Sequence, residues 1–598
     1  MRRGIVAGVI FLITSACCFA AGGTCPSGAN YLNPTTGALV TLSSLGITSC
    51  YYVAANGSDS NDGLSEATGH PWLHAPQMPN CSSNCATVQN AFNGPPAGTG
   101  FIFRGGDTWH FGASTSPSTG GQWTTGNNLN GTQTNPYYYG VDQSWYSGSS
   151  WARPILTGDN PVCGSPLTSG CTQGSLSTYT VKQYYVSSCD YQIGSANQMV
   201  AFAGSSHHIF DNFELTGVCQ SAVGQPANHD EYINYGSSGD MRFFNLYIHG
   251  WTHAHYADVN GGGNCNSGNV CFGISIFAGG SNQTPDDTLR YVVVDGSDSD
   301  PIAAQACYCD WNDVAYSYFG NQSNAIVRFP HLFHDNLYEY WYENGHGNVL
   351  ESVGDETGTN AFYNNVFRHI NTLGDPGDPL LWLLPATGTT DYFFNDLIYD
   401  VGTMEYFIAG NNNSNQGAYI LFNSTLQSNY SGNGISCSAT GNSSSLYLAN
   451  NYYVSDGSGF TITSSSNCSP RLMMQQTNLT MTNSTATSDS YSSSETYAYS
   501  PTSGSSPTVG AGTNEGSINS AFCSALGSAG LSAAATACAS ATTYACTYST
   551  SNHAMTCPAL TATARPPSGA WDVGAYQGSS TTTGAPPSAP TSLSTTAQ

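Results

Sequence analysis

Acidic and histidine side chains gather in one short stretch of an otherwise charge-poor chain. Only 8% of the 598 residues are Asp, Glu, Lys or Arg, yet eight of the 37 acidic residues lie within residues 331–378. Arg328 precedes this stretch and Arg368 lies inside it. The acidic residues are Asp335, Glu339, Glu343, Glu351, Asp355, Glu356, Asp375 and Asp378, and the histidines are His331, His334, His346 and His369. Carboxyl and imidazole groups can act as the acids and bases that cleave polysaccharides.

One interpretation of this cluster is glycoside hydrolysis, which needs two carboxyl groups roughly 5–9.5 Å apart. Glu351 lies in a predicted strand, and Glu343 and Asp378 are its candidate partners. Hydrolysis through these residues is therefore one reaction that the sequence predicts. The alternative is a solvated outer face whose carboxylates occupy turns, which implies no activity.

A second interpretation is β-elimination from a uronate, which needs a cation to neutralise the sugar carboxylate and a base to remove the ring proton. Arg328 and Arg368 are the candidate cations, and His346 or His369 is the candidate base. Candidate substrate contacts are Tyr340, Trp341, Asp355 and Glu356. We expect a polysaccharide lyase or glycoside hydrolase, with a non-catalytic, carbohydrate-binding surface protein as the alternative.

Acidic turns elsewhere contain the oxygen ligands that Ca²⁺ prefers. The candidate ligands are Asp295, Asp298 and Asp300 in one turn, and Asp59, Asn61 and Asp62 in another. Neither turn matches an EF-hand loop, and ordinary acidic turns are the alternative. The HGWTHAH segment around His249 has metal-ligand spacing, although structural histidines are the favoured explanation. Ca²⁺ is the one cofactor that we consider.

Asparagine recurs with a nearly constant period around predicted strands. The spacings between consecutive asparagines from Asn336 to Asn451 are 29, 30, 28 and 28 residues. The positions are Asn212, Asn245, Asn336, Asn365, Asn395, Asn423 and Asn451. Such a period is typical of a solenoid, whose coils stack about 4.8 Å apart so that equivalent side chains align and hydrogen-bond from coil to coil. A preference of Asn for turns does not explain a constant period.

Each period contains a further predicted strand. The candidates are residues 231–235, 272–277, 324–329, 348–353, 380–384 and 405–409. A propeller also repeats, but its four-stranded blades need about 40 or more residues. We therefore predict an all-β fold, a right-handed parallel β-helix with disulfide-stapled loops, in which residues one period apart are in contact.

Both ends of this solenoid carry motifs of a known fold. YYVAANGSDSNDGL followed by Pro71-Trp72 resembles the entry segment of secreted right-handed parallel β-helix proteins of the pectate-lyase-like superfamily. Pro507–Gly512 and RPPSGAWDVGAYQ resemble the closing segment of the same group. The resemblance covers residues 51–578 and implies the fold, but not one function, because the group includes lyases, hydrolases, epimerases and non-catalytic surface proteins.

A shorter motif, GHGNVLESVG, resembles the Gly-His-Gly strand of polygalacturonase-type glycoside hydrolases. The Asn-Thr-Asp, Asp-Asp and Arg-Ile-Lys motifs of those enzymes do not accompany it at the expected places. The resemblance therefore implies no more than a candidate role for His346.

The first residues indicate export. Arg2 and Arg3 precede an apolar run and small residues, which is typical of a signal peptide cleaved near Ala20 or Ala21. Neighbouring cysteines predict loop-stapling disulfides in an oxidising compartment, at Cys81/Cys85, Cys163/Cys171, Cys265/Cys271, Cys523/Cys538 and Cys546/Cys557. We predict a secreted protein with a signal peptide at 1–21, a capped β-helix over 22–578 and a Ser/Thr/Pro-rich flexible tail over 579–598.

The formal net charge of −26 limits the partners. A chain this acidic has no basic footprint for nucleic acid or anionic lipid. No later segment is apolar enough to enter a membrane. A hydrophobic content of 39% is sufficient for a core and argues against disorder. We expect a monomer whose partner is a polysaccharide.

Overall fold

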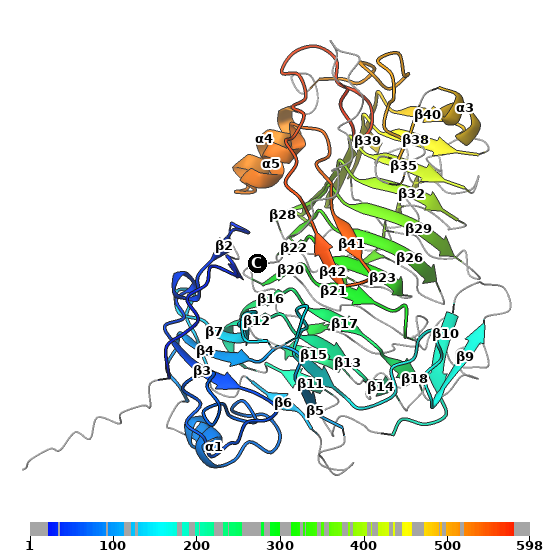
Figure 1. The fold of residues 1–598 in the computed structure, drawn as a ribbon. Helices are drawn as coiled ribbons and strands as arrows, with labels where there is room; N and C mark the ends of the chain where they lie inside the picture. Colours follow the sequence, from blue (N-terminus) through cyan, green and yellow to red (C-terminus); the bar gives the residue numbers. More distant parts are fainter. Residues whose placement is uncertain are drawn as a thin grey trace, which may run out of the picture.

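The computed structural model is a stack of β-coils, and its C-terminal segment returns along the side of the stack (Figure 1). The predictions for residues 1–21 and 579–598 lie outside the described residues. The structure describes residues 22–578 except 34–35, 91–93, 113–120, 126–128, 147, 176–181, 191–197, 203, 221–230, 237–238, 254–276, 280–286, 300–312, 323–326, 329–330, 344–348, 352–357, 373–380, 383–386, 403–407, 410–416, 430–434, 437–444, 457–471, 490, 493–494, 496–497 and 515–519.

Two long parallel sheets run along the stack. Sheet 1 contains, in order, β3 (Ser49–Val53), β4 (Thr99–Phe103), β7 (Tyr137–Val141), β12 (Ser206–Asp211), β16 (Gly239–Phe244), β20 (Thr288–Arg290), β22 (Asp313–Ala315), β25 (Leu332–His334), β28 (Thr359–Tyr363), β31 (Thr390–Phe394), β34 (Ala418–Phe422), β37 (Ser445–Ala449) and β39 (Leu472–Gln476). Sheet 2 contains β5 (Thr108–His110), β8 (Ile155–Thr157), β13 (Glu214–Thr216), β17 (Tyr247–His249), β21 (Val293–Asp295), β23 (Tyr318–Gln322), β26 (Leu337–Glu343), β29 (Val366–Thr372), β32 (Leu397–Val401), β35 (Thr425–Ser428), β38 (Tyr452–Ser455) and β40 (Leu479–Met481).

A third sheet face consists of shorter parallel strands. One part contains β6 (Trp123–Thr124), β11 (Gln198–Ala201), β15 (Glu231–Gly236) and β19 (Phe277–Gly279), and the other contains β24 (Val327–Arg328), β27 (Leu350–Glu351), β30 (Leu381–Trp382), β33 (Ile408–Ala409) and β36 (Ile435–Ser436). All six predicted further strands contribute residues to it. Crossovers between parallel strands of one sheet are right-handed almost without exception. The predicted right-handed parallel β-helix is thus confirmed, and a propeller, with its antiparallel blades, is excluded.

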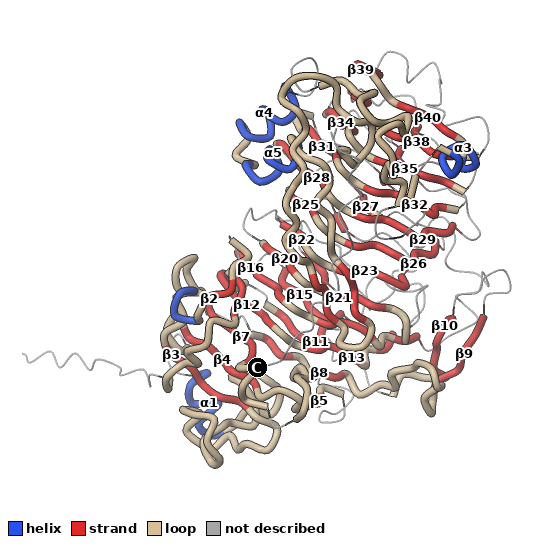
Figure 2. Tube along the Cα trace, turned by 45° about the horizontal axis from the view of Figure 1, so that its top comes forward, coloured by secondary structure: helices blue, strands red, loops and turns tan. Residues whose placement is uncertain are grey.

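The remaining elements lie outside the coils (Figure 2). The helices among the described residues are η1 (Leu42–Leu45), α1 (Ser83–Asn90), α3 (Asn483–Ser488), α4 (Ser520–Ser528) and α5 (Ser532–Cys538). The antiparallel hairpins are β1–β2 (Tyr31–Leu32, Leu39–Val40), β9–β10 (Cys171–Ser175, Lys182–Val186) and β41–β42 (Thr547–Ser549, Ala554–Thr556), and β14 (Cys219–Gln220) pairs with β18 (Thr252–His253) in parallel. No helix in the described part of the chain is both long and apolar enough to cross a membrane.

One continuous core fills the interior of the coils from Tyr51 to Tyr453. Equivalent aromatic rings stack along the axis, as Phe362 and Phe393 do with ring centres 4.6 Å apart. One coil buries its inward face only against the next coil, so stability comes from the stacking.

The asparagine period resolves into two adjacent columns at the turn between sheets 1 and 2. Residues of the first column have a left-handed backbone, which Asn tolerates better than most residues; they are Asn212, Asn245, Tyr291, Tyr316, Asp335, Asn364, Asn395, Asn423, Asn450 and Thr477. The second column is a hydrogen-bonded ladder of the next residues, Ser317, Asn336, Asn365, Asp396, Ser424, Asn451 and Asn478. Asn212, Asn245, Asn395 and Asn423 therefore do not belong to the ladder that contains Asn336, Asn365 and Asn451. Their next residues, Phe213, Leu246, Asp396 and Ser424, occupy that position.

Each ladder side chain from Asn336 onwards accepts a hydrogen bond from a backbone N–H of the coil before it. The Asn365 amide oxygen accepts the backbone N–H of Asn336 at 3.1 Å, and its amide nitrogen donates to the carbonyl of Phe333 at 3.0 Å. Asn365 is fully buried, so these groups have no access to water. The ladder satisfies backbone groups that tight turns would otherwise leave unpaired.

Asn365→Ala is expected to destabilise the fold by about 3 kcal/mol, because it leaves a buried N–H and a buried carbonyl without partners. The midpoint of chemical denaturation measures the change. Asn56→Ala, at an exposed loop position, is the matched control and should shift the midpoint little. Equal shifts for the two variants would show that the ladder adds no stability.

Residues 483–578, the C-terminal strap, pass back along the outside of the coils (Figure 1). Side chains of the first turn column hold the strap: Asn450 donates to Thr513, Asn395 to Ser540 and Asn364 to Thr543. Helices α4 and α5 cover the outer face of sheet 1, where Phe522 packs against Phe422. Glu495, in the first part of the strap, reaches sheet 2.

Six disulfides occur in the described residues. Four were predicted, Cys81–Cys85, Cys163–Cys171, Cys523–Cys538 and Cys546–Cys557, and two were not, Cys25–Cys50 and Cys189–Cys219. Cys265 and Cys271 lie outside the described residues. Bonds of this kind persist in oxidising compartments, which is compatible with export.

Candidate functional site

A bulge in three neighbouring strands of sheet 2 places side chains on its outer face. Glu339, Arg368 and Tyr399 are in register on β26, β29 and β32. The next residue of each strand, Tyr340, His369 or Asp400, has a left-handed backbone, with φ between 51° and 55°. Such an extra residue re-aims the side chains around it. Successive coils therefore present Tyr340, His369 and Asp400 about 4.8 Å apart.

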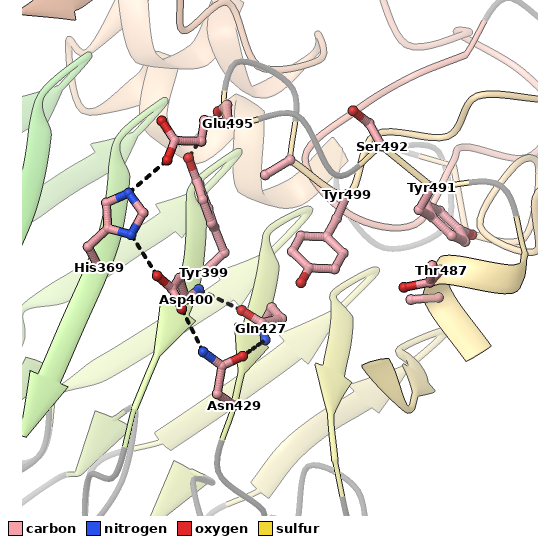
Figure 3. Close-up of a pocket in the computed structure, with 12 residues that line it drawn as sticks. His369, Tyr399, Asp400, Gln427, Asn429, Thr487, Tyr491, Ser492, Glu495 and Tyr499 are labelled. Atoms are coloured by element: carbon pink, nitrogen blue, oxygen red, sulfur yellow. Dashed lines mark hydrogen bonds and ion pairs between the residues drawn. The ribbon is translucent and has the colours of Figure 1, made fainter. Parts of the chain in front are cut away.

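His369 is held between two carboxylates. Its Nδ1 lies 2.6 Å from Asp400 on the next coil, and its Nε2 lies 2.9 Å from Glu495 on the strap (Figure 3). The His369 side chain is 21% exposed, whereas Asp400 is 47% and Glu495 58% exposed. Asp400, His369 and Glu495 are called the clamp below, because they join the strap to the coils.

Arg368 supports the clamp from the neighbouring position. Its guanidinium lies 2.6 Å from Glu339 and 3.4 Å from Glu495. The Tyr399 hydroxyl donates to the backbone carbonyl of Glu495 at 2.9 Å. Glu495 is therefore placed by one strap segment and three side chains of sheet 2.

A pocket of about 240 Å³ opens beside the clamp, between sheet 2 and the strap (Figure 3). Amides line its floor: Asn429 donates to Asp400 at 2.6 Å, and Gln427 accepts the Asp400 backbone N–H at 2.6 Å. The lining residues are His369, Tyr399, Asp400, Gln427, Asn429, Ala486, Thr487, Tyr491, Ser492, Glu495, Ala498 and Tyr499. Aromatic rings with a few fixed polar groups are characteristic of ligand pockets.

The contact between His369 and Asp400 favours the charged form of both side chains. The hydrogen bond from His369 lowers the pKa of Asp400, and the hydrogen bond to Asp400 raises the pKa of His369. A lowered carboxyl pKa stabilises the fold above the usual carboxyl range and loses this effect as the pH falls. A raised histidine pKa stabilises the fold at acidic and neutral pH and loses this effect as the pH rises past it. Both contributions of the His369–Asp400 pair are therefore present only at pH values above the lowered pKa of Asp400 and below the raised pKa of His369.

The clamp places two carboxylates on opposite sides of one imidazole ring. The two oxygens bound to His369 lie at most roughly 7 Å apart, given two near-linear hydrogen bonds and the imidazole ring between them. Inverting glycosidases separate their carboxyl groups by roughly 6.5–9.5 Å. Elimination fits less well, because both His369 nitrogens face carboxylates and Arg368 already pairs with Glu339.

The structure brings together three of the predicted site residues: Tyr340, Arg368 and His369. Glu343 and Glu351 lie on different sheets, on β26 and β27, and Arg328 is in register with Glu351 on the third sheet face. His346, Asp355, Glu356 and Asp378 lie outside the described residues. The expectations for these residues remain predictions.

Trp341 requires a correction. Its side chain is fully buried and belongs to the interior core, so it cannot contact a substrate from solvent. The bulge explains the difference, because Tyr340 occupies the extra outward position and Trp341 then points inward. Tyr340, by contrast, is 39% exposed.

Asp295 and Asp298 already have protein partners. Asp295 accepts from Asn321 and from the Tyr548 hydroxyl, and Asp298 accepts from His249 and from the backbone N–H of Gly250. No group of three or more His, Cys, Asp or Glu side chains in the described ranges is arranged to hold a metal ion. Asp300 lies outside these ranges. The described contacts give the calcium prediction no support.

Sequence reasoning missed Asp400, Glu495 and the amides of the pocket. Asp400 follows His369 by 31 residues, which is one coil period, so the repeat itself was a usable signal. Glu495 follows His369 by 126 residues and comes from the strap, so no period pointed to it.

The strand pairing, the turn ladder and the three-faced cross-section decide the fold. This chain has a parallel β-helix fold. No protein-family model and no curated protein matches the chain.

Several solved structures resemble this β-helix. Pectate lyase Pel9A is 14% identical with a TM-score of 0.36, over 88% of this chain and 96% of that one. A GH136 lacto-N-biosidase from Eubacterium ramulus is 11% identical with a TM-score of 0.32, over 68% and 63%. PfbA, a surface adhesin of Streptococcus pneumoniae, is 10% identical with a TM-score of 0.25, over 60% and 75%. Similarity this low carries no argument about the activity of the chain.

Proposed function

We propose that this chain is a secreted glycoside hydrolase that cleaves an uncharged polysaccharide at the clamp. The observation that carries the proposal is the pair of half-exposed carboxylates, Asp400 and Glu495, that flank His369 at the edge of the pocket. The pocket offers tyrosine rings and amides, which suit sugar faces and sugar hydroxyls.

The charges of the site favour an uncharged substrate. Glu339, Asp400 and Glu495 outnumber Arg368 and His369, and the whole chain carries a net charge of −26. A polyuronate would be repelled both at a distance and at the site. Arg368 is no free anion receptor, because Glu339 and Glu495 neutralise it.

Proton transfer follows from the hydrogen bonds of the clamp. The His369 imidazolium passes its Nε2 proton to Glu495, and Glu495 protonates the leaving glycosidic oxygen as the bond to the anomeric carbon breaks. Asp400, kept ionised by its lowered pKa, takes a proton from the water that attacks that carbon. The neutral imidazole keeps its Nδ1–H directed at Asp400.

Non-catalytic glycan binding is the second candidate. The observation that favours it is that both carboxylates are already neutralised, Asp400 by His369 and Glu495 by His369 and Arg368. Clamps of this kind also serve purely to hold two segments together.

A substrate screen tests the proposal. The purified protein is incubated with uncharged polymers, such as β-glucans, xylans and galactans, and with polyuronates. We expect new reducing ends from an uncharged polymer, and no absorbance of unsaturated uronates near 235 nm from any substrate. Unsaturated products would contradict the proposal in favour of elimination, and binding without cleavage would favour the second candidate.

A further inference from the structure

Tyr340 presents an aromatic ring one coil away from the clamp. Its ring is nearly parallel to the His369 imidazole, with ring centres 4.9 Å apart and an interplanar angle of 15°. One face of the ring is thus against His369. Because the side chain is nevertheless 39% exposed, much of the opposite face is open to solvent.

The preceding coil, which contains β23, does not cover the solvent-facing side of the Tyr340 ring. Asn321 is the equivalent residue on β23, and its amide donates at 3.0 Å to Asp295, on the coil below its own. The Asn321 side chain therefore turns away from Tyr340. Gly320 precedes Asn321 on β23 and is in register with Glu339. As a glycine, it has no side chain that could cover Tyr340.

Tyr340 has a left-handed backbone. Its φ is +55°, and the equivalent residues on neighbouring coils are Asn321, His369 and Asp400. Asn, Asp and His are the residues that tolerate this conformation best, whereas a bulky Tyr is an outlier there.

We infer that Tyr340 is the platform of a sugar subsite adjacent to the clamp, selecting pyranose units whose hydroxyls are all equatorial. This inference rests on the proposed function and extends it to the substrate class. All-equatorial rings of the gluco and xylo type present flat C–H faces, which pack on an aromatic ring, whereas an axial hydroxyl interrupts one face. The coil spacing of about 4.8 Å is close to the length of one sugar unit, so the glycan follows the helix axis past the clamp.

The test compares Tyr340→Asn with Tyr340→Phe, which keeps the ring. Dissociation constants are measured by calorimetry for gluco-, xylo- and manno-configured β-1,4-linked hexasaccharides, in an Asp400→Asn background that prevents turnover. We expect Tyr340→Asn to weaken binding of the gluco and xylo chains about tenfold and of the manno chain less, and Tyr340→Phe to bind like the parent. The thermal midpoint of Tyr340→Asn should equal or exceed that of the parent, because Asn suits the backbone better.

Unchanged affinity in Tyr340→Asn overturns the inference, as does an equal loss for all three chains. A lowered thermal midpoint with unchanged affinity would assign Tyr340 a packing role on His369 instead. The proposed hydrolysis fails separately, if the wild-type protein binds these chains through Tyr340 but releases no reducing ends.

Discussion

Asp400→Asn is expected to lower kcat for polysaccharide hydrolysis about 10³-fold, the range in which a positioned acid or base contributes. Asparagine keeps the shape of Asp400 and its contact with Asn429, but it cannot accept a proton from the attacking water. Glu495→Gln should have a comparable effect, because it removes the proton donor. Initial rates of reducing-end release, with binding measured in parallel, check both variants.

Asp456→Asn is the matched control for these variants. Asp456 is exposed and lies outside the pocket, and its one hydrogen bond, from the backbone N–H of Asn483 to Oδ1, can be kept by Asn, so its substitution should leave kcat unchanged. If Asp400→Asn retained more than about a tenth of the wild-type rate while folding normally, Asp400 would not be the base, since loss of such a group costs at least 10²-fold.

Asp391→Asn is expected to stabilise the protein at pH 8 by about 4 kcal/mol and to change its stability little at pH 4. Asp391 is 1% exposed and points into the coils, in register with Asn360 and Tyr419. The Asn360 amide donates to one oxygen at 2.8 Å, and the other oxygen has no partner. Burial raises the pKa of Asp391 to about 7.

The direction of the effect follows from this raised pKa. Below the ordinary carboxyl pKa, Asp391 is protonated in both the folded and the unfolded chain. As the pH rises towards 7, only the unfolded chain releases the proton, so the wild-type fold loses about 1.4 kcal/mol per pH unit. Asparagine does not titrate and avoids this loss.

Urea denaturation at pH 4 and pH 8 measures the difference, with Asp456→Asn as the exposed control. A gain that is equal at both pH values would point to packing rather than ionisation. A loss of stability at pH 8 would show that the Asp391 carboxylate has a stabilising partner.

The fold was predictable from the sequence because every coil has the same pattern of buried and turn residues. A coil that cannot bury its own apolar face needs neighbours, and the period of Asn336, Asn365 and Asn451 reports their alignment. The assignment of Asn212, Asn245, Asn395 and Asn423 to that column was wrong, and for the last two the reason is specific. The ladder requires a buried acceptor for a backbone N–H, and Asp396 and Ser424 supply one as well as Asn does.

The candidate site was only partly predictable. Arg368 and His369 were found because charged residues are scarce in this chain, but their roles differ from those expected, since each is paired with carboxylates. The outward position of Tyr340 and the inward position of Trp341 depend on a bulge, which a strict alternation of faces does not include. Glu495 belongs to the C-terminal strap, which the turn asparagines hold against the coils. Its contact with His369 is long-range, and no local sequence pattern predicts it.

The most direct test of a hydrolytic clamp is the anomeric configuration of the first product. Proton NMR of the wild-type protein acting on an uncharged β-linked oligosaccharide follows the new reducing end before mutarotation. A carboxylate separation of roughly 7 Å predicts that the α-anomer appears first, by inversion. Initial release of the β-anomer, or of an unsaturated sugar, would contradict the roles assigned to Asp400 and Glu495.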